Sequence, residues 1–317
     1  MSALYVGIDG GGTRTRAVVA AEDLVIRGRG TAGASNASRG SLAHVMEVIH
    51  EALDDALSAA GVGQGDVRRI CCGIAGVDAT GLRERLQWGL EKIFGFGRIQ
   101  VTTDARIALA GASEGPVGTP GIVLIAGTGA IAFGRNAKGE EARAGGWGPL
   151  LGDEGSGYAI AREGLMAVMR DLDGRGPDTL LRTTVLSSEG IGTPAELLLK
   201  VHRVDGGPSE VAAFYPMVLD AARQGDVLSL EIFRRAGAEL GLAAVTVARK
   251  LGMLGDAFRV ATVGGVFGAG ALILDPVREA LASVAPRATA GQAAFPPEIG
   301  AVRIAVAAEA AEAAGSA

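Results

Sequence analysis

The chain has 317 residues, of which 48% are hydrophobic and 50 are Gly. The hydrophobic content can support a packed core, and the length is typical of two domains. A net charge of −5 without any Lys- or Arg-rich run argues against nucleic-acid binding. No apolar run reaches the roughly 18 residues of a membrane span, and no signal peptide is visible. The two cysteines, Cys71 and Cys72, suit a reducing compartment, so we expect a cytoplasmic protein.

The first third of the chain is predicted to form a strand-rich α/β domain. Short Val- and Ile-rich runs come first, and strands then alternate with segments of helical spacing. The predicted strands are Leu4–Asp9, Arg16–Ala21, Leu24–Arg27, Arg69–Ile74 and Ile99–Thr102, and the predicted helices are Ser41–Ala60, Thr80–Ile93 and Asp104–Ala112. The last helix starts at an Asp, a preferred N-cap residue. Residues 114–120, rich in Gly and Pro, are the best candidate domain boundary.

The remaining chain opens as the first part does, with a strand, a turn of small residues and a second strand. We expect strands at Ile122–Ala126, Ile131–Arg135 and Arg259–Val263, a mostly helical stretch from Glu154 to about Leu254, and helices at Gly270–Ser283 and Ile299–Ala314. The similar openings suggest a duplication, although no residue-level repeat is detectable. We therefore expect two domains, 1–117 and 118–317, with a helical insertion in the second.

The first motif that indicates chemistry is Asp9-Gly10-Gly11-Gly12-Thr13-Arg14-Thr15, between two predicted strands. Consecutive glycines allow backbone N–H groups to turn toward one anion, and the two Thr residues add hydroxyl donors. The carboxylate of Asp9 can hold Mg²⁺. The alternative is a tight hairpin with an Asp turn residue, but three glycines favour phosphate binding.

Four further motifs are weaker when taken one at a time. Asp104 after Thr102-Thr103 is either a helix cap or a catalytic acid. Gly127-Thr128-Gly129 is either a second phosphate loop or a simple hairpin. Six glycines and two acids lie between Gly145 and Tyr158, a composition that suits close approach of the backbone to a ligand. A strand–glycine–helix junction spans Val263–Gly270, where close packing is the alternative.

Several other patterns are set aside. Gly28, Gly30 and Gly33 match a dinucleotide-binding pattern, but residues 34–38 intervene before the next helix, so we expect a flexible turn. The P-loop pattern and metal-binding Cys/His clusters are absent from the sequence, and its three histidines are expected to be structural or solvent-facing.

The order of these motifs resembles that of the actin–hexokinase–Hsp70 ATPase superfamily. The segments that start at Asp9, Gly127 and Gly264 are similar to its two phosphate loops and its adenosine loop. Gly145-Gly146-Trp147-Gly148 and Gly152-Asp153-Glu154-Gly155-Ser156 resemble the N-acetylglucosamine kinase branch of the BadF/BadG/BcrA/BcrD ATPase family. The resemblance implies a two-domain α/β fold of the ribonuclease H-like (actin-like ATPase) type with an interdomain nucleotide cleft. It also implies that the final helix packs on the first domain and that the protein is a homodimer.

The resemblance implies roles for individual residues, with ATP and Mg²⁺ as cofactors. Asp104 matches the catalytic base, and Asp9 matches the residue that helps to hold Mg²⁺. The residues expected at the nucleotide are Gly10, Gly11, Gly12, Thr13, Gly127, Thr128, Gly129, Gly264, Gly265 and Gly268. The residues expected at the sugar are Asn36, Asp104, Gly145, Gly146 and Asp153. Trp147 is expected to anchor its loop in the core, and Arg14 has no assigned role.

The function implied is an ATP-dependent kinase of the 6-hydroxyl of an amino sugar, with N-acetylglucosamine first and glucosamine second. A positioned carboxylate can accept the proton of the sugar hydroxyl, which is a poor nucleophile on its own. The alternative is an activator ATPase with an iron–sulfur cluster, but adjacent cysteines in a strand point to opposite faces and cannot readily share a cluster. A sugar-sensing regulator is a third possibility, disfavoured by the acidic charge balance.

Overall fold

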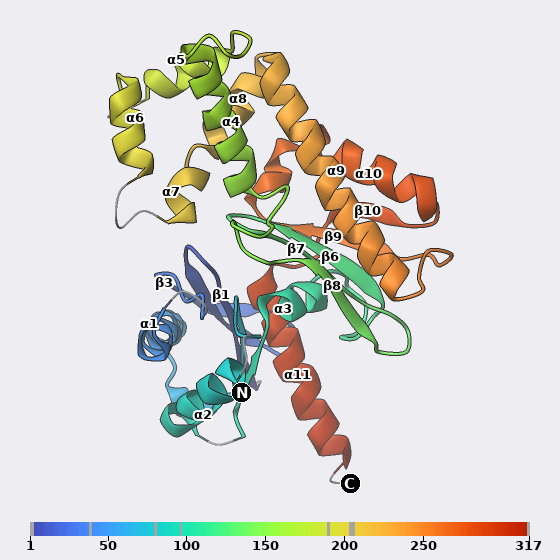
Figure 1. Cartoon of the computed structure of the whole chain (residues 1–317). Helices are drawn as coiled ribbons and strands as arrows, with labels where there is room; N and C mark the ends of the chain where they lie inside the picture. The colour runs from blue at the N-terminus through green and yellow to red at the C-terminus, as the bar shows by residue number, and fades with distance from the viewer. Residues whose placement is uncertain are drawn as a thin grey trace. The chain divides into compact units, whose positions relative to one another are not determined.

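The computed structural model describes residues 3–37, 40–78, 81–95, 97–188, 191–202 and 207–315 (Figure 1). It divides into two compact units. Unit 1 comprises Met1–Val123, Ala137–Gly139 and Gln292–Ala317, and unit 2 comprises Leu124–Asn136 and Glu140–Gly291. Among the described residues, none of the helices combines the length and apolar character that crossing a membrane requires.

Unit 1 contains a five-stranded mixed sheet with the order β3-β2-β1-β4-β5. Its strands are β1 (Leu4–Gly10), β2 (Thr15–Ala21), β3 (Ile26–Ala32), β4 (Val67–Ile74) and β5 (Ile99–Thr102). β1 runs antiparallel to β2 and parallel to β4, and β5 is parallel to β4. The carboxyl ends of β1, β4 and β5 therefore meet at one edge of the sheet, which is where ligands bind in many α/β proteins.

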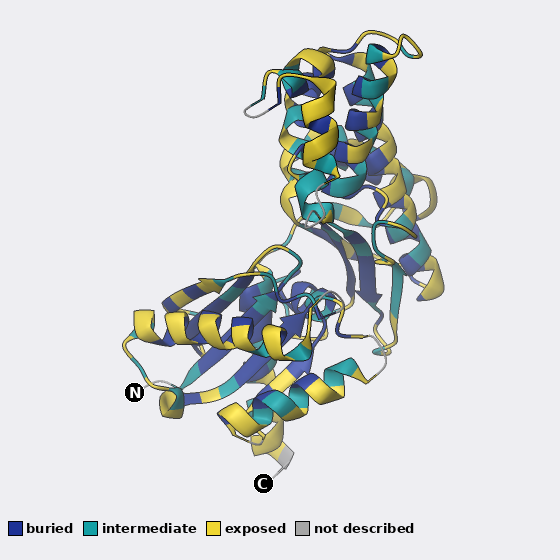
Figure 2. Cartoon of the chain, turned by 60° about the vertical axis from the view of Figure 1, so that its left-hand side comes forward, coloured by how far each residue is buried: buried dark blue, intermediate teal, exposed yellow. Residues whose placement is uncertain are grey.

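Helices cover both faces of this sheet. The first face, here called the α1 face, packs against α1 (Leu42–Ala60) and α2 (Leu82–Phe94), and the 3-10 turn η1 (Gln64–Asp66) leads into β4. The second, here called the α11 face, packs against α3 (Asp104–Ala110) and α11 (Pro297–Gly315). In Figure 2 the strands are largely buried, and the outer sides of these helices are exposed. The predicted start of α2 at Thr80 lies outside the described residues.

Strand alternation decides which side chains face which helices. Val6 and Ile8 belong to the core on the α1 face, whereas Tyr5 belongs to the core on the α11 face. Cys72 likewise lies on the α1 face and Cys71 on the α11 face, and both are fully buried. The prediction that the two thiols point to opposite faces is therefore confirmed.

The expected flexible turn at Gly28–Gly33 is wrong, because most of it is strand β3. A Cβ atom at Gly28 would overlap the carbonyl oxygen of Ala56, and one at Gly30 would overlap that of Ala52. These two glycines let helix α1 approach the strand closely. The glycine pattern is thus explained by helix–strand packing.

The second five-stranded sheet has the order β10-β9-β6-β7-β8. Its strands are β6 (Gly121–Ala126), β7 (Ala130–Arg135), β8 (Glu141–Gly145), β9 (Arg259–Val263) and β10 (Thr289–Gln292). The helices are α4 (Gly157–Leu172), α5 (Leu180–Leu186), α6 (Pro194–Val201), α7 (Pro208–Ala212), α8 (Tyr215–Arg223), α9 (Val227–Lys250), η2 (Gly265–Ala269) and α10 (Ala271–Val284). Those from α4 to α9 form the helical insertion expected from the sequence.

The two sheets have the same strand order. Read from its β8 edge, the second sheet has the order β8-β7-β6-β9-β10. Each strand corresponds to the strand at the same place in β3-β2-β1-β4-β5. The strands β6, β7 and β9 were predicted from the sequence, whereas β8 and β10 were not. This equivalence of topology supports the suspected duplication.

Candidate active site

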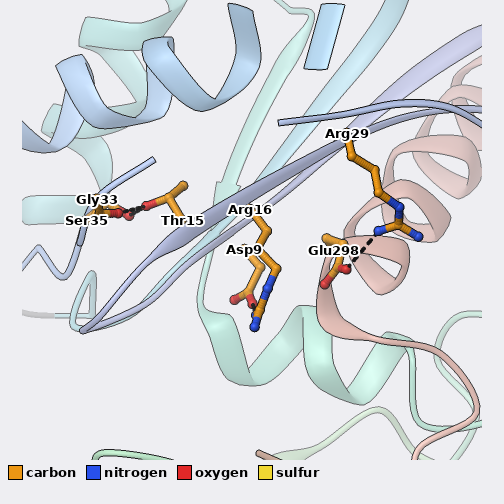
Figure 3. Close-up of polar contacts among 7 residues, drawn as sticks. All are labelled: Asp9, Thr15, Arg16, Arg29, Gly33, Ser35 and Glu298. Carbon is orange, nitrogen blue, oxygen red and sulfur yellow. Dashed lines mark hydrogen bonds and ion pairs between the residues drawn. The ribbon is translucent and has the colours of Figure 1, made fainter. Parts of the chain in front are cut away.

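Asp9 stands near the carboxyl end of β1, in the row Tyr5, Gly7, Asp9 that faces α11. Its side chain is 16% exposed, and Arg16 on β2 donates to its Oδ2 at 3.3 Å (Figure 3). Burial, followed by the negative charges of Asp104 and Glu298, raises the pKa of Asp9 to about 7 against the opposing effect of Arg16. A carboxylate held among other acids in this way favours a bound cation.

Asp104 is the first residue of α3, directly after β5. The predicted Asp N-cap is wrong by one residue: Thr103 is the N-cap, and its hydroxyl accepts from the Arg106 N–H at 3.2 Å. The Ala105 N–H instead donates to Asp104 Oδ1 at 2.9 Å. Burial is the main cause that raises the pKa of Asp104, and the charge of Asp78 adds to it. A raised pKa makes Asp104 a stronger proton acceptor than an ordinary surface Asp.

The glycine hairpin between β1 and β2 is tied to the loop that carries Asn36. Within the hairpin, the Gly11 N–H donates to the Arg14 carbonyl at 3.1 Å, and Thr13 and Arg14 are exposed. The Ser35 N–H donates to Gly11 O at 3.1 Å, and on the other side of Asn36 the Ala37 N–H donates to Ala75 O at 2.9 Å. Asn36 is thereby held beside Gly10, Gly11 and Gly12.

Thr15 does not serve as the phosphate donor suggested by the sequence. It is fully buried, and its hydroxyl donates to Gly33 O at 2.8 Å and lies 2.7 Å from Ser35 Oγ (Figure 3). The hydroxyl thus fastens the Asn36 loop to β2. Among the predicted residues of unit 1, Asp9, Asp104, Asn36 and the hairpin lie at one edge of the sheet.

Unit 2 brings Gly127-Thr128-Gly129 together with Asp153. The Gly127 N–H donates to Gly129 O at 2.9 Å, which closes the turn between β6 and β7. The Ala130 N–H donates to Asp153 Oδ1 at 3.3 Å, and Asp153 adopts a φ of 63° that few non-Gly residues take. A Cβ atom at Gly129 would lie 2.9 Å from Asp153 Oδ2. The carboxyl of Asp153 therefore packs directly on this turn.

The glycine-rich loop after β8 begins beside the same turn. The Gly146 N–H donates to Ala130 O at 2.9 Å, and both Gly145 and Gly146 have positive φ. The predicted burial of Trp147 is wrong: the side chain is 62% exposed, with the Arg143 guanidinium 4.5 Å above its ring. Its glycine neighbours provide no apolar side chains against which an indole could pack.

The adenosine-loop candidate also lies next to this turn. Gly264 has a φ of 112°, and a Cβ atom there would overlap the carbonyl oxygen of Ala126, immediately before Gly127. Gly265 and Gly268 belong to the 3-10 turn η2, which the Tyr215 hydroxyl fastens by donating to Val266 O at 3.0 Å. The structure thus brings Asp153, Gly145, Gly146 and Gly264 to the turn at the end of β6.

Two residues at the unit 1 site were not found from the sequence. Arg16 pairs with Asp9, and Glu298, in the first turn of α11, adds charge beside it. Arg16 could have been found from strand alternation, since it is directly opposite Asp9 in the β1–β2 register. No sequence pattern links Glu298 to the site, because almost the whole chain separates it from Asp9.

The model of the BadF/BadG/BcrA/BcrD ATPase family matches residues 6–305. The chain belongs to this family. The match covers nearly every element of both units, including both glycine hairpins and the first half of α11, and it confirms the resemblance drawn from the motifs.

The curated relatives that the chain matches are sugar kinases. The N-acetylmuramic acid/N-acetylglucosamine kinase of Clostridium acetobutylicum is 33% identical over 82% of this chain and 84% of its own. The N-acetyl-D-glucosamine kinase of Dictyostelium discoideum is 30% identical over 79% of this chain and 81% of its own. A solved structure, an N-acetylglucosamine kinase candidate from Chromobacterium violaceum, is 28% identical with a TM-score of 0.77, and the match covers 96% of this chain and 99% of that one. These matches confirm the predicted actin-like ATPase fold class.

Proposed function

We propose that the protein is an ATP-dependent kinase that phosphorylates the 6-hydroxyl of N-acetylglucosamine. The observation that carries the proposal is the pair of acids at one sheet edge: Asp104 is close enough to Asp9 for its charge to raise the pKa of Asp9. One carboxylate can accept a proton while the other binds a cation, the two functions that transfer of a phosphoryl group to an alcohol needs. The similarity to sugar kinases over about four-fifths of the chain supports the substrate class.

In this proposal Asp104 accepts the proton of the sugar hydroxyl through Oδ2, while the Ala105 N–H holds Oδ1. The hydroxyl oxygen forms its bond to the γ-phosphorus as the bond from that phosphorus to the ADP oxygen breaks. Asn36, Gly145, Gly146 and Asp153 hold the sugar hydroxyls and the acetamide so that only one hydroxyl reaches the phosphate.

The nucleotide in this proposal is held by backbone donors rather than by lysines. Gly10, Gly11, Gly12 and Thr13 contact phosphate from one hairpin, and Gly127, Thr128 and Gly129 from the other. Gly264, Gly265 and Gly268 lie against adenine and ribose. Small residues at these positions let the main chain approach the ligand.

Asp9 fits a magnesium ion. It is a partly buried carboxylate near other acids, and among the described residues no group of three or more metal-binding side chains is present. Mg²⁺ keeps several waters and binds through one or two carboxylates together with substrate phosphates, which suits this arrangement. When bound, the ion would neutralise charge that develops on the phosphates.

The cytoplasmic location and the homodimer expected from the sequence belong to the same proposal.

A second candidate, the iron–sulfur activator ATPase, is not favoured by the cysteines. Cys71 and Cys72 are buried on opposite faces of the sheet, and burial raises the pKa of Cys71 to about 12. Cluster ligands are thiolates that converge on one metal group. These two thiols meet neither requirement.

The test measures ATP consumption with N-acetylglucosamine, glucosamine, glucose or no sugar. Turnover is expected to depend on an amino sugar and to fall by more than about 100-fold in Asp104→Asn, because general base catalysis contributes roughly 10²–10⁴-fold. Asp78→Asn is the matched control, an exposed acid near Asp104 that should retain most of the turnover. Sugar-independent hydrolysis that is the same in Asp104→Asn would refute the kinase proposal.

A further inference from the structure

The carboxyl group of Glu298 is buried with one oxygen unsatisfied. Glu298 lies in the first turn of α11, and its side chain is 6% exposed. Oε1 pairs with the Arg29 guanidinium at 3.4 Å (Figure 3), but Oε2 is buried and has no hydrogen-bond partner in the part of the chain that the structure describes. A buried carboxylate oxygen without a donor is costly, so it needs an explanation.

The backbone packing brings this carboxyl group to the Asp9 site. The first turn of α11 lies directly on β1, where a Cβ atom at Gly7 would overlap the carbonyl oxygen of Glu298. Gly7 and Asp9 are two residues apart in a strand and face the same side. Figure 3 shows Glu298 on the same side of the strands as Asp9 and Arg16. The charge of Glu298 is also among the causes that raise the pKa of Asp9.

The charges around this point do not balance. Asp9, Asp104 and Glu298 supply three carboxyl groups, against the guanidinium of Arg16 and that of Arg29. The Arg29 side chain is 56% exposed, so solvent screens much of its charge. The surplus of negative charge therefore favours a cation.

We propose that Glu298 is a positioning residue of the magnesium site, and that its Oε2 accepts a hydrogen bond from a water molecule carried by the ion at Asp9. This inference rests on the proposed function, in which Asp9 holds Mg²⁺. Mg²⁺ retains its water ligands, whose protons are strong donors, and such a water supplies the partner that Oε2 lacks. Indirect contact also agrees with the absence of a three-ligand metal group among the described residues.

A purely structural role explains only part of these observations. An acid in the first turn of a helix is stabilised by the helix dipole, and Oε1 has an ion pair with Arg29. A carboxyl group whose Oε2 is exposed to solvent would gain both effects equally well. Neither explains why Oε2 is buried beside Asp9 without a donor.

The test is the affinity of the ADP-saturated protein for Mn²⁺, a spectroscopic substitute for Mg²⁺, measured from the electron paramagnetic resonance of free Mn²⁺. Glu298→Gln should weaken Mn²⁺ binding about tenfold, as loss of an outer-shell partner does elsewhere. Arg29→Gln is the matched control: it removes the partner of Oε1 and keeps the carboxylate, so Mn²⁺ should bind as well as to the wild type or more tightly.

Equal Mn²⁺ affinity in Glu298→Gln and the wild type would overturn the inference, and so would equal weakening in Glu298→Gln and Arg29→Gln. If Glu298→Gln does not fold, Glu298→Asp replaces it, since the shorter side chain keeps the charge but withdraws the oxygen, and the same weakening is expected. Failure of the wild type to bind ADP would instead refute the proposed function. Binding of ADP and Mn²⁺ with no effect of Glu298 would leave that function standing.

Discussion

The raised pKa of Asp9 predicts that replacing Asp9 with Asn stabilises the metal-free protein above neutral pH. The pKa of Asp9 is about 7 in the folded chain, against 3.8 for the unperturbed group. The difference of about 3 units corresponds to about 4 kcal/mol at 1.36 kcal/mol per unit. The side chain is only 16% exposed, so solvent screening removes little of this, and we take 4 kcal/mol as the upper limit.

The sign follows from the direction of the shift. A group with a raised pKa in the folded state binds its proton more tightly there than in the unfolded chain. Its contribution to stability is fully present below about pH 4 and is lost as the pH rises through about 7. Asn cannot ionise, so Asp9→Asn should match the wild type near pH 4 and exceed it by up to about 4 kcal/mol at pH 8.

Urea unfolding in the presence of EDTA, followed by circular dichroism at several pH values, measures this difference. Glu47→Gln, which removes an exposed carboxyl group on α1, is the control and should show no such pH-dependent gain. A gain in Asp9→Asn that is the same at pH 5 and pH 8 would refute the electrostatic explanation. A variant less stable than the wild type at pH 8 would show that the carboxylate is satisfied by Arg16.

Three further predictions concern packing and hydrogen bonding. Asp226 accepts from Thr179 Oγ1, the Leu180 N–H, the Ser229 N–H and Ser229 Oγ at 2.7–2.9 Å, so Asp226→Ala should lower the free energy of unfolding by about 3 kcal/mol, and Asp226→Asn by less, in urea titrations. Gly129→Ala should cost about 1–3 kcal/mol because its Cβ meets Asp153, whereas Gly127→Ala, with open space at that position, should cost less than about 1 kcal/mol in thermal unfolding. Thr15→Val should raise the KM for the sugar more than the KM for ATP, because the Asn36 loop loses its fastening to β2; equal changes in both constants would argue against that role.

The interior strands and the long helices could be predicted from the sequence, because their side chains carry the burial pattern. The strands that were missed, β8 and β10, are both edges of the second sheet. β8 reads Glu-Ala-Arg-Ala-Gly and β10 reads Thr-Ala-Gly-Gln, which have little intrinsic preference for strand. At an edge, pairing with the one neighbouring strand decides the structure, and the residues of the edge strand do not themselves show that pairing. The same reason explains β3, whose glycines were interpreted as a turn.

Candidate site residues can be proposed from the sequence where a local pattern marks them and not where packing assembles them. Asp9 and Gly127–Gly129 stand at strand ends among glycines, so the sequence shows them. Thr103 and Asp104 are both good caps, and only the backbone shows which one occupies the position. Glu298 reaches Asp9 through the packing of α11 on Gly7, a contact that no local pattern encodes.

Because the two sheets share one strand order, the β1–β2 turn and the β6–β7 turn are equivalent, yet their side chains differ. Counting back from the first glycine of each hairpin, the position of Asp9 in β1 corresponds to Ala126 in β6. Ala126 is fully buried and uncharged, whereas Asp9 retains a partly exposed carboxyl group. The two equivalent turns are thus chemically unlike: the first has a carboxyl group before its glycines, which we propose holds a cation, and the second has a methyl group at that position. Specialisation of this kind needs a change at one side chain and no change in topology.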